Sequence, residues 1–301
     1  MSDSSLAIVF AFIAAFGFAS GNILVRFGTQ QVSAPAATFF TVLTGAILVL
    51  GLAFVFNLPD IKALEPITFA WFALMGAMAY PVARVLINTA ITMVGTTRAT
   101  PMNSLQPVFA LGLGIILLGE RPSLLVSLGT PTVVVGLAMV VMSANSTRTG
   151  EQVFTPRNLG YLLAALGALT FAGRDVISRH VVSGIAPPLV TAAFALTIGG
   201  LMLFAVIHRD VVRSLRYLPG RYVTACCAAG IFQGIAIASL FLALSRAPVT
   251  VVSPINASSA LITLALAHLF LRRLESVNLP LLLGTLLSVG GVIMVVLGAL
   301  R

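Results

Sequence analysis

The chain has 301 residues, of which 59% are hydrophobic and only 8% are charged. Soluble domains carry about 25% charged residues, so this composition excludes a water-soluble globular protein. In a soluble protein the net charge of +9 would suggest nucleic acid. Here the basic residues lie mostly between apolar segments, which favours contact with anionic lipid headgroups. Cys226 and Cys227 are adjacent within an apolar segment, a pattern that provides neither a disulfide framework nor a metal site.

Apolar segments of about 20 residues recur along the chain, which is the length a helix needs to cross a bilayer core. We expect ten membrane-spanning helices, at about 6–26, 35–56, 67–89, 99–118, 124–143, 158–179, 188–207, 222–243, 250–271 and 279–300. The first segment lacks the basic start of a signal peptide. Its end, FASGNILVR (18–26), resembles the internal stretch FAGRDVISR (171–179), so we expect a retained helix.

An internal repeat organises these segments. At an offset of 155 residues the matched pairs are Ser104 and Ser259, Glu120 and Glu275, Gly129 and Gly284, and Gly136 and Gly291. We predict an all-α membrane protein with two five-helix halves, 1–145 and 146–301, joined by a polar linker at about 144–157. Because each half crosses the membrane an odd number of times, the second half enters from the opposite side. Such inverted repeats enclose a midplane site in many secondary transporters.

Prolines interrupt the beginnings of the fourth and ninth segments, at Pro101, Pro107, Pro248 and Pro254. Proline frees a backbone carbonyl, which at membrane depth needs protein or cavity water. The polar residues at these breaks include Asn103, Gln106, Asn256 and Ser259. We expect them to line a central polar cavity. The alternative is that they only form hydrogen bonds between helices.

The third segment carries Tyr80, Arg84 and Asn88, which share one helical face. A charged side chain at this depth is costly, so a partner is expected to offset it. A substrate carboxylate or phosphate on Arg84 is one candidate. The other is that Arg84 extends to the membrane interface. Gln233 occupies the position equivalent to Tyr80 in the second half.

Asp175 is the only one of the eight acidic residues that lies well inside an apolar segment. It precedes Arg179 by four residues, the favourable order for a helical ion pair. It is also a candidate proton-coupling carboxylate. Glu120 and Glu275 follow apolar segments and have basic neighbours, so we expect structural interface charges there.

The chain carries no sequence motif of a metalloprotease, a serine hydrolase or a phosphate-binding loop. We therefore expect no enzyme activity, no metal and no cofactor. The expected partners are the lipid bilayer and a small-molecule substrate, without nucleic acid.

The two-fold five-helix pattern, the element LLGERPSLLVSLG (117–129) and its counterpart FLRRLESVNLPLLLG (270–284) resemble the drug/metabolite transporter superfamily, and in particular the ten-helix EamA-type exporters. In the second copy Leu274 and Ser276 replace the glycine and arginine that flank the glutamate. The resemblance implies a bacterial inner-membrane carrier with a cavity between the third, fourth, eighth and ninth helices. In this chain those helices bear Tyr80, Arg84, Asn103, Gln106, Gln233, Asn256 and Ser259. It implies amino acids, their metabolites or drugs as substrates.

We therefore expect a secondary exporter of a small organic solute that works by alternating access. The alternatives from other classes are an intramembrane enzyme and a membrane sensor or assembly partner without transport. The orientation is open, because the resemblance implies cytoplasmic termini, whereas five basic residues lie on the side of the termini and ten on the other. Counted by the positive-inside rule, that distribution places the termini outside.

Overall fold

The computed structural model describes residues 3–94, 99, 102, 104–145, 157–214, 220–270 and 279–300. Within these ranges the chain forms helices and no strand. In chain order the helices are α1 (Asp3–Gly28), α2 (Ala34–Phe56), α3 (Leu58–Lys62), α4 (Pro66–Ala77), the π-helical turn η1 (Met78–Val82), α5 (Ala83–Val94), α7 (Gln106–Leu118), α8 (Leu124–Asn145), α9 (Arg157–Val182), α10 (Pro188–Ser214), α11 (Gly220–Arg246), α12 (Val249–Ala257), α13 (Ser259–Phe270) and α14 (Leu279–Leu300).

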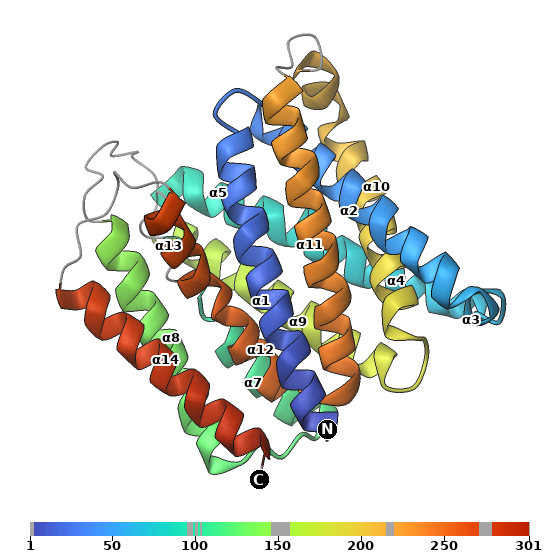
Figure 1. Ribbon diagram of the computed structural model, residues 1–301. Helices are drawn as coiled ribbons and strands as arrows, with labels where there is room; N and C mark the ends of the chain where they lie inside the picture. The colour runs from blue at the N-terminus through green and yellow to red at the C-terminus, as the bar shows by residue number, and fades with distance from the viewer. Residues whose placement is uncertain are drawn as a thin grey trace.

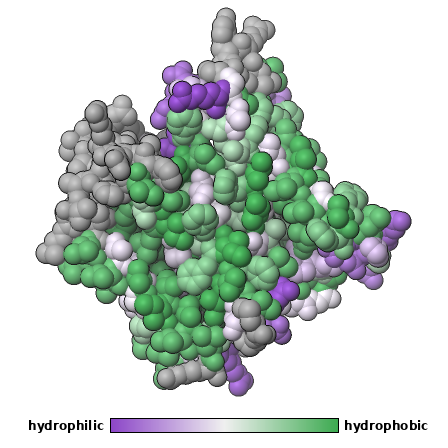
Figure 2. All heavy atoms as spheres, viewed as in Figure 1, coloured by the Kyte–Doolittle hydropathy of each residue, from purple (hydrophilic) through white to green (hydrophobic). Residues whose placement is uncertain are grey.

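In this described part, nine helical segments are long and apolar enough to cross a membrane, and α7 is a shorter apolar helix. The third crossing is built from α4, η1 and α5, and the ninth contains α12 and α13. Apolar side chains cover the middle of the face in Figure 2, and hydrophilic residues gather towards the edges of the molecule. The prediction of an all-α, two-repeat membrane protein is confirmed.

The packing of α8 against α14 reveals how the two halves are related (Figure 1). A Cβ atom built on Gly129 would lie 2.8 Å from the carbonyl oxygen of Gly291, and one built on Gly136 would lie 2.6 Å from that of Gly284. Exchanging the halves converts the first contact into the second, as in an interface with two-fold symmetry. The pairing also runs in opposite directions along the two helices, so the repeats are inverted.

A second set of glycines repeats this symmetry at the crossings of α2 with α11 and of α4 with α10. A Cβ on Gly45 would lie 3.0 Å from the carbonyl oxygen of Gly230, and a Cβ on Gly76 would lie 2.7 Å from the nitrogen of Gly199. Small residues let helix backbones approach closely where lipid offers no hydrophobic drive for packing. Each half therefore packs its helices against those of the other half.

Two crossings depart from regular α-helix near their middle. Pro81 lies inside η1 and lacks the N–H that a regular α-helical turn needs, and the backbone widens there into a π-helical turn. In the ninth crossing α12 contains Pro254 and ends at Ala257, and α13 begins again at Ser259. These irregular turns place Tyr80 and the Asn256–Ser259 region inside the bundle.

Candidate functional site

A charged cluster lies where α7 meets α9. The Nη2 atom of Arg174 lies 2.7 Å from one carboxylate oxygen of Asp175, and the side-chain amide of Gln106 donates to the other at 2.9 Å. The Asp175 side chain is only 2% exposed. A buried pair of this kind pays a large desolvation cost, which further hydrogen bonds such as that from Gln106 help to offset.

The expected ion pair between Asp175 and Arg179 is wrong. Arg179 lies near the end of α9, and its Nη1 atom donates to the carbonyl oxygen of Leu244 at 2.5 Å. Leu244 belongs to the last turn of α11, where carbonyl groups lack partners within the helix. The adjacent Arg174 forms the ion pair with Asp175 instead.

Tyr80 and Arg84 form a second part of the cluster, on the third crossing. The guanidinium carbon of Arg84 lies 5.6 Å from the centre of the Tyr80 ring, a cation–π arrangement. Tyr80 is 9% exposed and Arg84 is half-buried. Within the described ranges, no carboxylate pairs with Arg84 and no hydrogen bond is made by the Tyr80 hydroxyl.

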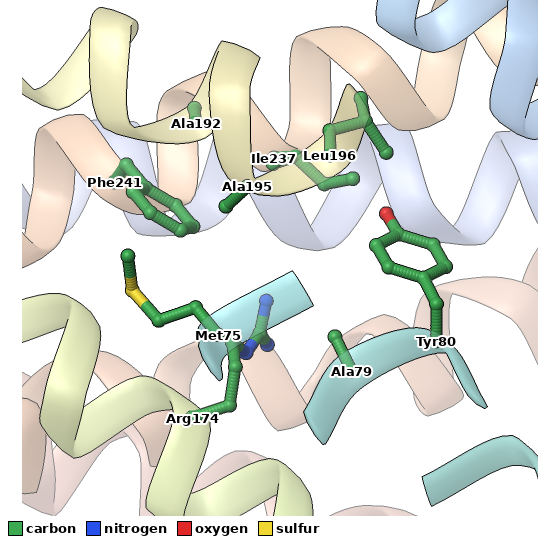
Figure 3. A pocket seen from close by; sticks show the side chains of 9 residues that line it. All are labelled: Met75, Ala79, Tyr80, Arg174, Ala192, Ala195, Leu196, Ile237 and Phe241. Carbon is green, nitrogen blue, oxygen red and sulfur yellow. The ribbon is translucent and has the colours of Figure 1, made fainter. Parts of the chain in front are cut away.

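A small cavity joins these two parts, because Tyr80 and Arg174 both line it (Figure 3). The rest of its lining is apolar and comes from the third crossing, α10 and α11: Met75, Ala79, Ala192, Ala195, Leu196, Ile237 and Phe241. Its volume is about 10 Å³, which is space for one water molecule. Pockets for small organic ligands occupy roughly 300–1,000 Å³. A solute can enter only if the surrounding helices move apart.

The structure thus brings together four of the expected site residues: Tyr80 and Arg84 with each other, and Gln106 with Asp175. Arg174 connects the two pairs. Arg174 is not among the residues expected from the sequence to form the site. The apolar lining had no detectable signal, since Met75 or Ile237 resembles any other apolar residue of a membrane helix.

The other expected residues lie elsewhere. The side-chain amide of Gln233 is 3.5 Å from the Asn22 oxygen, between α11 and α1. The Oδ1 atom of Asn256 is buried without a partner, and the Ser259 carbonyl accepts a bond from Thr263. Asn88 is exposed. In the part of the chain that the structure describes, no hydrogen bond links these four residues to the charged cluster, and Asn103 lies outside that part.

Contacts link the two halves at the end of the bundle where both chain termini lie (Figure 1). The two carboxylate oxygens of Glu120 accept bonds from the backbone nitrogens of Val249 at 2.8 Å and Thr250 at 3.0 Å. These N–H groups belong to the first turn of α12, where they lack helical partners and favour an anion. The Ser123 hydroxyl, also of the first half, donates to the carbonyl of Gly298 at 3.1 Å.

Comparison with known proteins agrees with this architecture. A solved structure titled "Crystal structure of protein" has a TM-score of 0.79 and 21% identity, covering 99% of this chain and 98% of its own. At that identity the likeness concerns the fold. No curated protein matches the chain. The profile of the EamA-like transporter family matches twice, at residues 5–142 and 158–297. These two matches cover nearly the whole chain, which therefore belongs to the EamA-like transporter family of the drug/metabolite transporter superfamily.

Proposed function

We propose that this transporter is a secondary carrier that exports a small organic solute, amino-acid-like or drug-like, by alternating access. The observation that carries the proposal is the cavity of about 10 Å³ lined by Tyr80 and Arg174. Its walls come from both halves, and its volume is far below that of a bound solute. The small volume supports a motion of the halves relative to each other to admit a solute, as in inverted-repeat carriers with a fixed midplane site.

In this proposal Arg84 anchors an anionic or zwitterionic group of the solute, because a guanidinium without a carboxylate partner at this depth favours a bound anion. Asp175 is the proposed proton-coupling group. The resemblance to EamA-type exporters supports a bacterial inner membrane. Gln233, Asn256, Ser259, Asn88 and Asn103 remain proposed cavity residues that a bound solute would reach in an open state.

The test is solute flux in vesicles containing the purified full-length protein. We expect saturable uptake or release of one or more amino-acid-like or drug-like solutes, with a rate that responds to a pH gradient. Protein-free vesicles are the control. Absence of flux for every solute and every gradient would contradict the proposal and favour a sensor or assembly role.

Alternating access is tested separately at the end of the bundle where Glu120 contacts α12. Glu120→Cys and Thr250→Cys, in a chain whose Cys226 and Cys227 are replaced by alanine, can be bridged by a short bifunctional thiol reagent. We expect bridging to stop flux and cleavage of a reducible bridge to restore it. Unchanged flux in bridged vesicles would show that this end need not open.

A further inference from the structure

Arg174 brings an unpaired hydrogen-bond donor to the wall of the cavity. The Nε atom of Arg174 is buried without a partner. In the ranges described above, the Tyr80 hydroxyl makes no hydrogen bond and the Arg84 guanidinium has no acidic partner. An arginine side chain can only donate. Asp175 Oδ1 is the one acceptor beside Arg174, through the ion pair, and it leaves the Arg174 Nε atom unpaired. An oxyanion would supply an acceptor for that atom.

The charges in this region point the same way. Arg84 and Arg174 are cations, and Asp175 is the only acid that contacts either of them within the described ranges. The region carries one positive charge in excess when all three are ionised. A cationic solute would add to that excess, whereas a monoanion would neutralise it.

The position of Arg174 between Asp175 and the cavity gives each residue a distinct part. Arg174 lines the cavity and is 12% exposed, whereas Asp175 is 2% exposed and is held by Gln106 from α7. Asp175 thus presents a carboxylate to the guanidinium from the protein side while the cavity has no room for another. An incoming carboxylate would meet the same guanidinium from the cavity side.

We propose that Arg174, in place of Arg84, is the residue that selects the solute, by binding the carboxylate of a small monoanion with an apolar body. Asp175 is the resident counter-ion that occupies Arg174 while the cavity is empty and that the solute carboxylate displaces. The apolar body packs against Met75, Leu196, Ile237 and Phe241, which line the rest of the cavity. A carboxylate fits better than a phosphate, because Arg174 already holds a carboxylate, that of Asp175. The proposal rests on the carrier function above and names its solute class.

The experiment measures binding to the purified full-length protein in detergent by thermal stabilisation. The probes share one skeleton and differ in charge: 3-phenylpropanoate, uncharged 3-phenylpropanamide and cationic 3-phenylpropylamine, with hexanoate as a second carboxylate. We expect the carboxylates to bind at least about tenfold more tightly than the amide and the amine. Binding of the amide or the amine as tight as that of the carboxylates, or no stabilisation by either carboxylate up to its solubility, would overturn the proposal.

Substitutions distinguish the role of Arg174 from that of Asp175. Arg174→Gln should abolish the preference for carboxylates, and Arg174→Lys should keep a weakened one, because lysine keeps the charge but not the planar fork. Asp175→Asn should tighten carboxylate binding by about tenfold, since the internal competitor is gone. Arg209→Gln, at an exposed position near the end of α10, is the control for loss of a positive charge. Asp175→Asn protein that elutes as a folded monodisperse species and binds carboxylates more weakly than the unmodified chain would contradict the counter-ion role.

Failure of this proposal is distinguishable from failure of the carrier function. If vesicles transport neutral or cationic solutes and the protein ignores carboxylates, the chain is a carrier with another solute class. If carboxylates bind but no solute is moved under any gradient, the solute site stands and the transport function fails.

Discussion

Two equivalent places in the inverted repeat have acquired different chemistry. At an offset of 153 residues, Asp175 corresponds to Asn22, Arg174 to Gly21, and Tyr80 to Gln233. On α9 and the third crossing these positions form a buried, charged cluster beside a cavity. On α1 and α11 they form a neutral amide pair at 3.5 Å, at the limit of a hydrogen bond, on an exposed surface. The duplication produced the same arrangement of helices twice, and only one of the two places carries charged side chains at these positions.

Among substitutions that compare the charged cluster with the neutral Asn22–Gln233 pair, Arg174→Ala is expected to reduce stability most. This change leaves the buried carboxylate of Asp175 without its counter-charge, at a cost of about 3–5 kcal/mol in stability. Thermal unfolding in detergent measures it. The double variant Arg174→Met with Asp175→Leu removes both charges and should recover most of the loss, and a double variant as unstable as the single one would contradict the ionic explanation.

A smaller loss is expected from Gln106→Leu, which keeps the size of the side chain and removes its hydrogen bond to Asp175. Hydrogen bonds to charged groups contribute about 1.5–3 kcal/mol. The unfolding midpoint should fall accordingly. Gln106→Leu should cost less stability in a chain that carries Asp175→Asn, because a neutral amide depends less on Gln106. An equal loss in the unmodified chain and in the Asp175→Asn chain would argue against this contact.

The glycine contacts at helix crossings, unlike the charged cluster, occur at equivalent places in both halves, so enlarging the glycine should destabilise the protein at either place. Gly76→Ala and Gly230→Ala each place a methyl group against the backbone of a crossing helix, within 2.7 Å of the Ala195 carbonyl oxygen in the first case. Overpacking costs about 1–3 kcal/mol, and we expect chemical or thermal unfolding to show a loss for both variants, the larger for Gly230→Ala, whose Cβ would also meet the Thr44 hydroxyl. Gly51→Ala, where a Cβ meets nothing within 4 Å, is the matched control. Unchanged stability at either site would contradict the close approach of these helices.

The smallest effect is expected from Gln233→Ala at the neutral place. The hydrogen bond between the Gln233 and Asn22 side-chain amides is long and exposed. The free energy of unfolding should therefore change by no more than about 0.5 kcal/mol. The same unfolding measurement applies. A loss as large as that of Gln106→Leu would mean that the neutral pair is as important to the fold as the charged cluster.

The fold was largely predictable because its signals are long and repeated. Apolar segments marked each crossing, and the matched glycines that announced the repeat, Gly129 with Gly284 and Gly136 with Gly291, are the residues at which α8 and α14 touch. In a membrane, close packing depends on such small residues, so the sequence pattern and the physical contact coincide.

The site was predictable only in part. Tyr80, Arg84, Gln106 and Asp175 stood out because polar groups are costly at membrane depth. The partner of Asp175 did not, because helical spacing favoured Arg179, whereas the carbonyl of Leu244, on another helix and 65 residues away, takes that side chain. The cavity itself depends on which apolar residues face each other across α10, α11 and the third crossing, and hydrophobicity carries no such information.

The Glu120 carboxylate accepts hydrogen bonds from two backbone N–H groups in the first turn of α12. Neither hydrogen bond involves a side chain of the second half. Both bonds are made by backbone groups, which every residue except proline provides. In this link between the halves, Glu120 is therefore the side chain that matters, and any substitution of Val249 or Thr250 other than proline would leave both donors in place.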